Sequence, residues 1–109
     1  MAGALDALWE KFLPEIEQRV AVLEGAAAAL EAGAMQPAQL EDAHSAAHKL
    51  AGTLGTFGLT RGTELARELE LMFSPDMAAG IAQGARARQI AVEMRAIIAS
   101  RKAPLYGNS

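Results

Sequence analysis

Alanine is the residue that most constrains what this chain can fold into, because it occupies 25 of the 109 positions. It is the best helix former and is poor in strands. Aromatic residues make up only 5% of the chain, so a core has to be built from Leu, Ala, Ile, Val and Met. These features indicate an all-α fold, and 109 residues suit a single domain near the lower size limit for a self-sufficient core.

Apolar residues recur at helical spacing over residues 4–33, with Pro14 inside the run. A proline interrupts a helix or begins a new one. The pattern therefore predicts a short first helix at about 4–12 and a second helix from Pro14 to about Glu31.

Three more helices are expected further along, at about 37–57, 61–73 and 81–102. Glycine or proline marks the breaks, in residues that suit helix starts, helix ends and turns: Gly33, Pro37, Gly58, Ser74-Pro75-Asp76 and Gly80. Because the connections are short, we expect an antiparallel four-helix bundle over about 14–102 with a short additional N-terminal helix. Residues 103–109 look like a loose tail.

Finer features of the helices can also be predicted. Thr60 is a candidate N-cap. The last helix carries a set of apolar residues: Ile81, Ile90, Val92, Met94, Ile97 and Ile98. Trp9 and Phe12 could cap the bundle or pack near a docking site, and of these we expect capping. The face with Arg86, Arg88 and Arg95 is expected to be solvated, with a salt-dependent partner contact as the alternative.

Composition excludes several classes of function. The net charge of −3 gives no reason to expect nucleic acid as a partner, and the absence of cysteine excludes disulfides and thiolate metal sites. No apolar run approaches the ~20 residues that a membrane span needs, and no secretion signal is recognisable. We expect a cytoplasmic monomer with no membrane partner.

His48 is the residue that the helical geometry singles out. At 100° per residue, the apolar residues of segment 37–57 form one stripe: Leu40, Ala43, Ala47, Leu50, Leu54 and Phe57. His48 lies about 130° from the centre of that stripe and is therefore predicted to face solvent.

Small residues surround His48 on its own face. That face holds Glu41, His44, Ser45, Ala51, Gly52 and Gly55. A glycine inside a helix costs roughly 1 kcal/mol relative to alanine. Since this chain uses alanine freely, Gly52 and Gly55 indicate that a partner approaches the backbone closely, although seating a neighbouring helix or softening the helix end would also explain them.

An exposed imidazole that is partly neutral at cellular pH has a lone pair that can attack a phosphoryl group. That reaction also needs Mg²⁺ and in-line geometry. The chain has no suitable carboxylate cluster and no glycine-rich nucleotide loop. His48 would therefore be supplied by this chain while the partner supplies the catalytic groups.

The segment that begins at Ala47 resembles the signature of histidine-containing phosphotransfer (HPt) domains. The matching residues are the histidine itself, Leu at +2, Gly at +4, and Gly at +10 before an apolar residue: His48, Leu50, Gly52, Gly58 and Leu59. Downstream, the family's Ala-x-x-Leu-Glu segment is matched by Ala66, Leu69 and Glu70. The motif-level resemblance covers about residues 37–73.

This resemblance implies a four-helix bundle in which His48 accepts a phosphoryl group from a receiver-domain aspartate and returns it to another receiver. It implies a carrier rather than an enzyme, with no cofactor of its own and with Mg²⁺ on the receiver. The partners would be response-regulator receiver domains and a hybrid histidine kinase. Many members carry Lys three residues after the histidine, where this chain has Ala51, so Lys49 is the nearest cation on the helix.

Two other readings of the same face stay open. Glu41, His44 and His48 are spaced so that they could form a three-ligand face for Zn²⁺ or another divalent ion. Alternatively, the glycine-cleared face docks a partner protein without phosphoryl transfer. Ser45, Gly52, Gly55, His44, Ala51 and Lys49 are the residues expected to contact the phosphoryl group or the partner.

Overall fold

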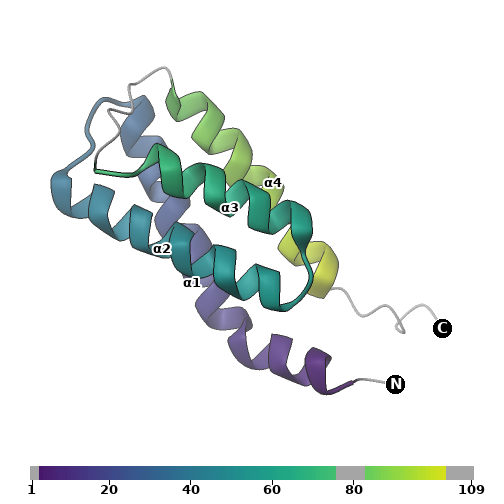
Figure 1. Cartoon of the computed structure of the whole chain (residues 1–109). Helices are drawn as coiled ribbons and strands as arrows, with labels where there is room; N and C mark the ends of the chain where they lie inside the picture. The colour runs from purple at the N-terminus through teal and green to yellow at the C-terminus, as the bar shows by residue number, and fades with distance from the viewer. Residues whose placement is uncertain (1–2, 76–82, 103–109) are drawn as a thin grey trace.

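The computed structural model describes residues 3–75 and 83–102, and the regular structure within them is helical. Its four helices are α1 (Ala4–Glu31), α2 (Pro37–Thr56), α3 (Thr60–Met72) and α4 (Gly84–Lys102). They pack in a ring, in which α1 and α3 each contact both α2 and α4 (Figure 1). This confirms the all-α four-helix bundle, and none of the described helices is long and apolar enough to cross a membrane.

Side-chain contacts between neighbouring helices show that they run antiparallel. Between α1 and α4, Arg88 pairs with Glu31 and Arg95 with Glu24, so residue numbers rise on one helix as they fall on the other. Between α2 and α3 the connection is only a few residues long, and the chain reverses direction there (Figure 1).

The first helix corrects the predicted break at Pro14. Instead of a short helix at 4–12 and a second one from Pro14, α1 is a single helix of 28 residues with Pro14 inside it. Pro14 lies on the exposed side, while Trp9 and Ile16 on either side of it are both buried. Burial of one continuous apolar stripe outweighs the lost backbone hydrogen bond, so helix direction is kept through the proline.

Glycines end the first two helices as predicted. Gly33 has a φ of 69° and Gly58 a φ of 72°, a conformation that glycine adopts without steric cost. The expected N-cap at Thr60 is wrong, since Leu59 caps α3 and Thr60 is its first helical residue, with no side-chain capping bond. Because the helix begins directly after Leu59, Thr60 is already inside α3 and cannot take the non-helical N-cap position.

The remaining predicted boundaries agree with the helices to within a few residues. Residues 76–82 lie outside the described part of the chain, so the predicted turn at Asp76 and Gly80 and the place of Ile81 have no structural counterpart here.

The core is a continuous cluster of leucine, isoleucine, alanine, methionine and a few aromatic side chains. Val92 was expected in the apolar set of the last helix but is 63% exposed. It sits about 200° around the helix from Ile90, which is fully buried with Met94 and Ile98.

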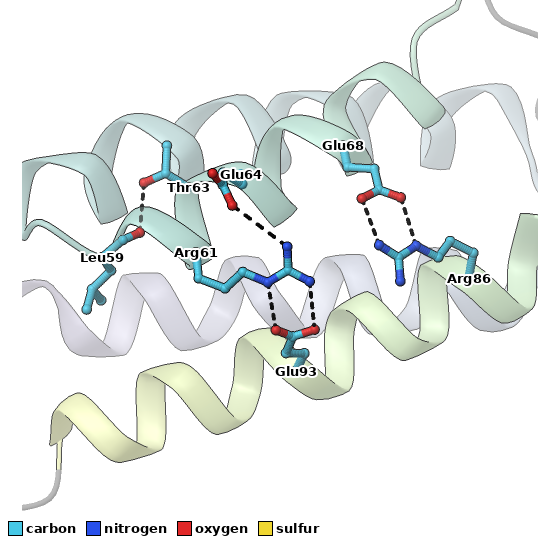
Figure 2. A network of polar contacts seen from close by, with 7 residues as sticks. All are labelled: Leu59, Arg61, Thr63, Glu64, Glu68, Arg86 and Glu93. Atoms are coloured by element: carbon cyan, nitrogen blue, oxygen red, sulfur yellow. Dashed lines mark hydrogen bonds and ion pairs between the residues drawn. The ribbon is translucent and has the colours of Figure 1, made fainter.

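Within residues 3–75 and 83–102, five ion pairs join α4 to its two neighbours. On the α3 side Arg61 pairs with Glu93 and Arg86 with Glu68, both through two hydrogen bonds (Figure 2). On the α1 side the pairs are Arg88–Glu31, Arg95–Glu24 and Arg101–Asp6. The face with Arg86, Arg88 and Arg95 is therefore not simply solvated, because each guanidinium lies against a carboxylate of a neighbouring helix.

Candidate functional site

Helix α2 presents His48 to solvent, with 71% of its side chain exposed. Ala47 and Leu50, on the opposite side of the same helical turn, are completely buried. The prediction that His48 faces away from the core is confirmed. The imidazole is anchored by a stiff, well-packed helix and projects from it, which fixes its position without covering it.

The His48 ring is oriented by a contact with Glu70 on α3. Its Oε2 lies 2.7 Å from Nδ1 of His48, and 25% of the Glu70 side chain is exposed. An ionised carboxylate can only accept hydrogen bonds, so Nδ1 carries the proton and donates it. The neutral ring then has its lone pair on Nε2, the other ring nitrogen.

Glu70 is the site residue that sequence reasoning missed. The sequence places it in the Ala-x-x-Leu-Glu segment, but it was assigned no role there. Its separation of 22 residues from His48 carries no periodic signal. Only the packing of α3 against α2 brings the two side chains together.

The residues expected beside His48 are only partly placed as predicted. Ser45, Gly52 and Gly55 are exposed, as expected, and His44 is half-buried. Ala51 is a correction, because it is only 5% exposed. It lies about 60° from His48 toward α3, close enough to the neighbouring helix for that helix to cover it.

The two glycines differ in what surrounds them. A Cβ built on Gly52 would meet no atom within 4 Å, so no packing within the described structure requires glycine there. A Cβ on Gly55 would lie 3.6 Å from Oγ1 of Thr63, an ordinary contact with α3. Packing against a neighbouring helix thus partly explains why position 55 is a glycine, but it does not explain the glycine at position 52.

A shallow groove between α1 and α2 opens next to His48. Its lining combines apolar, hydroxyl and charged side chains with one glycine: Phe12, Glu15, Arg19, Lys49, Gly52, Thr53, Thr56 and Phe57. Lys49 and Gly52 are the residues that connect this groove to the turn carrying His48. Phe12 is half-buried and lines this groove, which agrees with the alternative that it packs near the docking site.

Trp9 closes the end of the bundle behind this groove. It is buried, its ring packs edge-on against Phe57 at 5.0 Å, and the Arg101 guanidinium lies 5.4 Å from the ring centre. Among the described residues, nothing forms a hydrogen bond with the indole Nε1. Trp9 thus has the capping role predicted for it, and it supports the floor of the groove through Phe57.

The metal alternative finds no support in the side-chain arrangement. Within residues 3–75 and 83–102 no three His, Cys, Asp or Glu side chains gather as they would around an ion. Glu41, His44 and His48 share one helix, but the ring of His48 is turned toward Glu70 on α3.

Comparison with known proteins gives a family match over most of the chain and a curated relative. A family model described as the Hpt domain matches residues 7–101. Protein RcaC of Microchaete diplosiphon is 38% identical over 66 residues, which cover 61% of this chain and 10% of that protein. The chain thus spans about a tenth of the length of this curated relative. No solved structure gives a significant match.

Proposed function

The chain belongs to the Hpt domain family, which transfers phosphoryl groups in phosphorelay signalling, and on that premise we propose that His48 is the residue that carries the phosphoryl group. It accepts the group from the aspartate of one response-regulator receiver domain and passes it to another. A hybrid histidine kinase stands upstream. The contact between Nδ1 of His48 and Glu70, which leaves Nε2 as the free nucleophile on an exposed ring, carries this proposal.

The transfer itself exchanges one bond for another. The Nε2 lone pair attacks the phosphorus of the aspartyl phosphate, the N–P bond forms, and the P–O bond to the aspartate breaks with its electrons going to the carboxylate. The ring keeps its Nδ1 proton and gains positive charge. Glu70, 2.7 Å from that nitrogen, stabilises the charged ring and fixes its orientation.

Docking of the receiver uses the exposed surface around the histidine. Gly52 and Ser45 leave room for the receiver loops that surround its aspartate, and Gly55 extends the cleared surface along α2. The groove supplies apolar contact through Phe12 and a cation through Lys49. His44, half-buried one turn before His48, contributes at the edge. Ala51 is too buried to be a contact.

This chain acts as a carrier, and the remaining catalytic groups belong to the partner. Mg²⁺ on the receiver neutralises charge on the phosphoryl group during transfer. Once His48 is phosphorylated, this chain has only to hold the phosphoryl group in the right orientation. Helix α2 and Glu70 do this.

A transfer assay tests the proposal. Receiver domains are phosphorylated with a labelled phosphoryl donor, separated from the donor, and incubated with the wild-type chain, with His48→Gln, and with His44→Gln as the matched histidine control. We expect acid-labile, base-stable label on the wild type and on His44→Gln, and none on His48→Gln. Absence of label from the folded wild type with every receiver tried would favour a docking module that does not carry phosphate.

A further inference from the structure

Arg67 on α3 differs from every other arginine in the described residues. The other six each have a carboxylate partner: Arg19, Arg61, Arg86, Arg88, Arg95 and Arg101. Arg67 is exposed, and no hydrogen bond or ion pair holds it in the part of the chain that the structure describes. In a protein of net charge −3 with many surface carboxylates, one unpaired guanidinium is a free cation.

The packing register places Arg67 beside His48. Glu70 contacts His48, and Thr63 lies against Gly55, so residues that face each other on α2 and α3 have numbers that add up to the same value. In that register Arg67 is opposite Ala51, between the two observed contacts. It is one helical turn from Glu70, about 4.5 Å along α3, on the side of α3 that faces α2.

The charges around His48 leave a place for a cation there. A phosphoryl group on a protein side chain carries about −1.5 to −2 charges at neutral pH, and Glu70 adds a further negative charge at the same ring. On α2, position 51 holds an alanine, and His44 is half-buried. Lys49 lies on the other side of His48, in the groove that also contains Glu15 and Arg19.

We infer that Arg67 binds the phosphoryl group on Nε2 of His48 and balances its charge. This rests on the proposed function only in that His48 must be able to carry a phosphoryl group. A guanidinium has a planar set of N–H donors that matches phosphate oxygens, and the long, unpaired side chain of Arg67 can present them from α3. The cation for the phosphohistidine thus comes from the neighbouring helix, across the interface from Ala51.

A phosphorus NMR titration tests the inference without any receiver. The chain is phosphorylated with phosphoramidate: Nε2 of His48 attacks phosphorus, the N–P bond of the donor breaks, and ammonia leaves. The pH titration of the phosphoryl signal is compared between wild type and Arg67→Gln. Removing the cation is expected to raise the phosphoryl pKa by about half a pH unit, an about threefold change in its protonation equilibrium.

Three more variants make the result specific. Arg88→Gln removes an arginine on α4 that pairs with Glu31 and should leave the titration unchanged. Lys49→Gln should shift the titration less than Arg67→Gln does. Adding Ala51→Lys to Arg67→Gln returns a cation from the facing position and should restore the wild-type midpoint. The role of Arg67 would be overturned if Arg67→Gln titrated at the same pH as the wild type, or if Lys49→Gln shifted the titration more than Arg67→Gln does.

The outcomes also separate this inference from the proposed function. If phosphoramidate labels His48 and Arg67→Gln has no effect, only the role of Arg67 is lost. If His48 is labelled and the Arg67 effect is present but no receiver exchanges the group, the relay is refuted and the cation site stands. If His48 of the folded chain takes no phosphoryl group, both are refuted.

Discussion

At the scale of single residues, the chemistry depends on which nitrogen of His48 is free. In the proposed mechanism Glu70 determines this by accepting a hydrogen bond from Nδ1, with 2.7 Å between Nδ1 and Oε2. A hydrogen bond to an ionised group is among the stronger ones in proteins, although partial exposure to water weakens it here. The role proposed for Glu70 is to hold the tautomer and the ring orientation in which Nε2 points outward.

Replacing Glu70 with alanine should therefore slow phosphoryl transfer from a receiver by about five- to tenfold, which corresponds to roughly 1 kcal/mol of lost orientation and charge stabilisation. Glu70→Gln keeps an oxygen acceptor without the charge, so its transfer rate should lie between those of the wild type and Glu70→Ala. Initial transfer rates at fixed receiver concentration measure the effect. Glu64→Ala, an exposed glutamate of the same helix that pairs with Arg61, is the control. An unchanged rate in Glu70→Ala would remove Glu70 from the site.

Gly52 gives a second prediction at this scale. Because a Cβ there meets open space, Gly52→Ala should raise the free energy of unfolding by about 1 kcal/mol, measured by denaturant titration. Gly25 on α1 is also mid-helix and open, so Gly25→Ala should stabilise the fold by a similar amount.

A large side chain should affect the rate of phosphoryl transfer differently at Gly52 and at Gly25. Gly52→Phe is expected to reduce transfer from a receiver by about tenfold or more, because the ring occupies the surface that the partner approaches. Gly25→Phe should transfer as the wild type does. Equal transfer rates in the two phenylalanine variants would show that the open surface at Gly52 is not used by the partner.

At the scale of elements, α1 shows how packing overrides local preference. Pro14 removes one amide donor, and its ring crowds the carbonyl of Glu10, yet the helix continues because Trp9 and Ile16 stay buried on its inner face. Pro14→Ala should therefore raise the free energy of unfolding by about 1–3 kcal/mol. Thermal unfolding followed by circular dichroism measures this. A variant no more stable than the wild type would mean that the proline is accommodated without cost.

The elements also show which parts of the molecule could be predicted from the sequence. Helix ends at Gly33 and Gly58 follow from the conformation that glycine alone adopts freely, and the exposure of His48 follows from helical periodicity. Both depend on residues close together in the chain. Ala51 was misplaced because single-helix geometry does not say where the neighbouring helix lies.

Contacts between distant residues were out of reach for the same reason. Glu70 lies 22 residues from His48, and the ion pairs of Arg88 and Arg95 join residues 57 and 71 positions apart. Charged residues on amphipathic helices can pair in many ways, and the choice is made by the register in which the apolar stripes pack. The exposure of His48 could thus be predicted from the sequence, while the side chain that contacts its ring could not.

At the scale of the whole molecule, the ion pairs around α4 make stability depend on pH. Hydrogen bonds from Arg101, Arg86 and Arg61 lower the pKa of Asp6, Glu68 and Glu93, respectively. A carboxyl whose pKa is lower in the folded state stabilises the fold above its ordinary pKa, which is 3.8 for Asp and 4.5 for Glu. That contribution is lost as the pH falls through the lowered values.

We therefore expect the melting temperature to be flat from pH 7 to about 5 and to fall below about 4.5, more gently at high salt because exposed pairs are screened. Thermal unfolding between pH 7 and pH 3 checks this. Glu68→Gln should melt lower than wild type at pH 7 and approach it at pH 3, where the wild-type carboxyl is also losing its charge. Parallel pH profiles for the two proteins would contradict the stabilising role of the Arg86–Glu68 pair.

Whether His48 carries a phosphoryl group on Nε2 between two receivers can be measured by a discharge experiment. The chain is charged by one phosphorylated receiver, repurified, examined by phosphorus NMR, and mixed with a second receiver and Mg²⁺. We expect one phosphoryl group per chain, on Nε2 of His48, and its transfer to the second receiver. Label on any other residue, or label that only hydrolyses and never reaches a receiver, would contradict it.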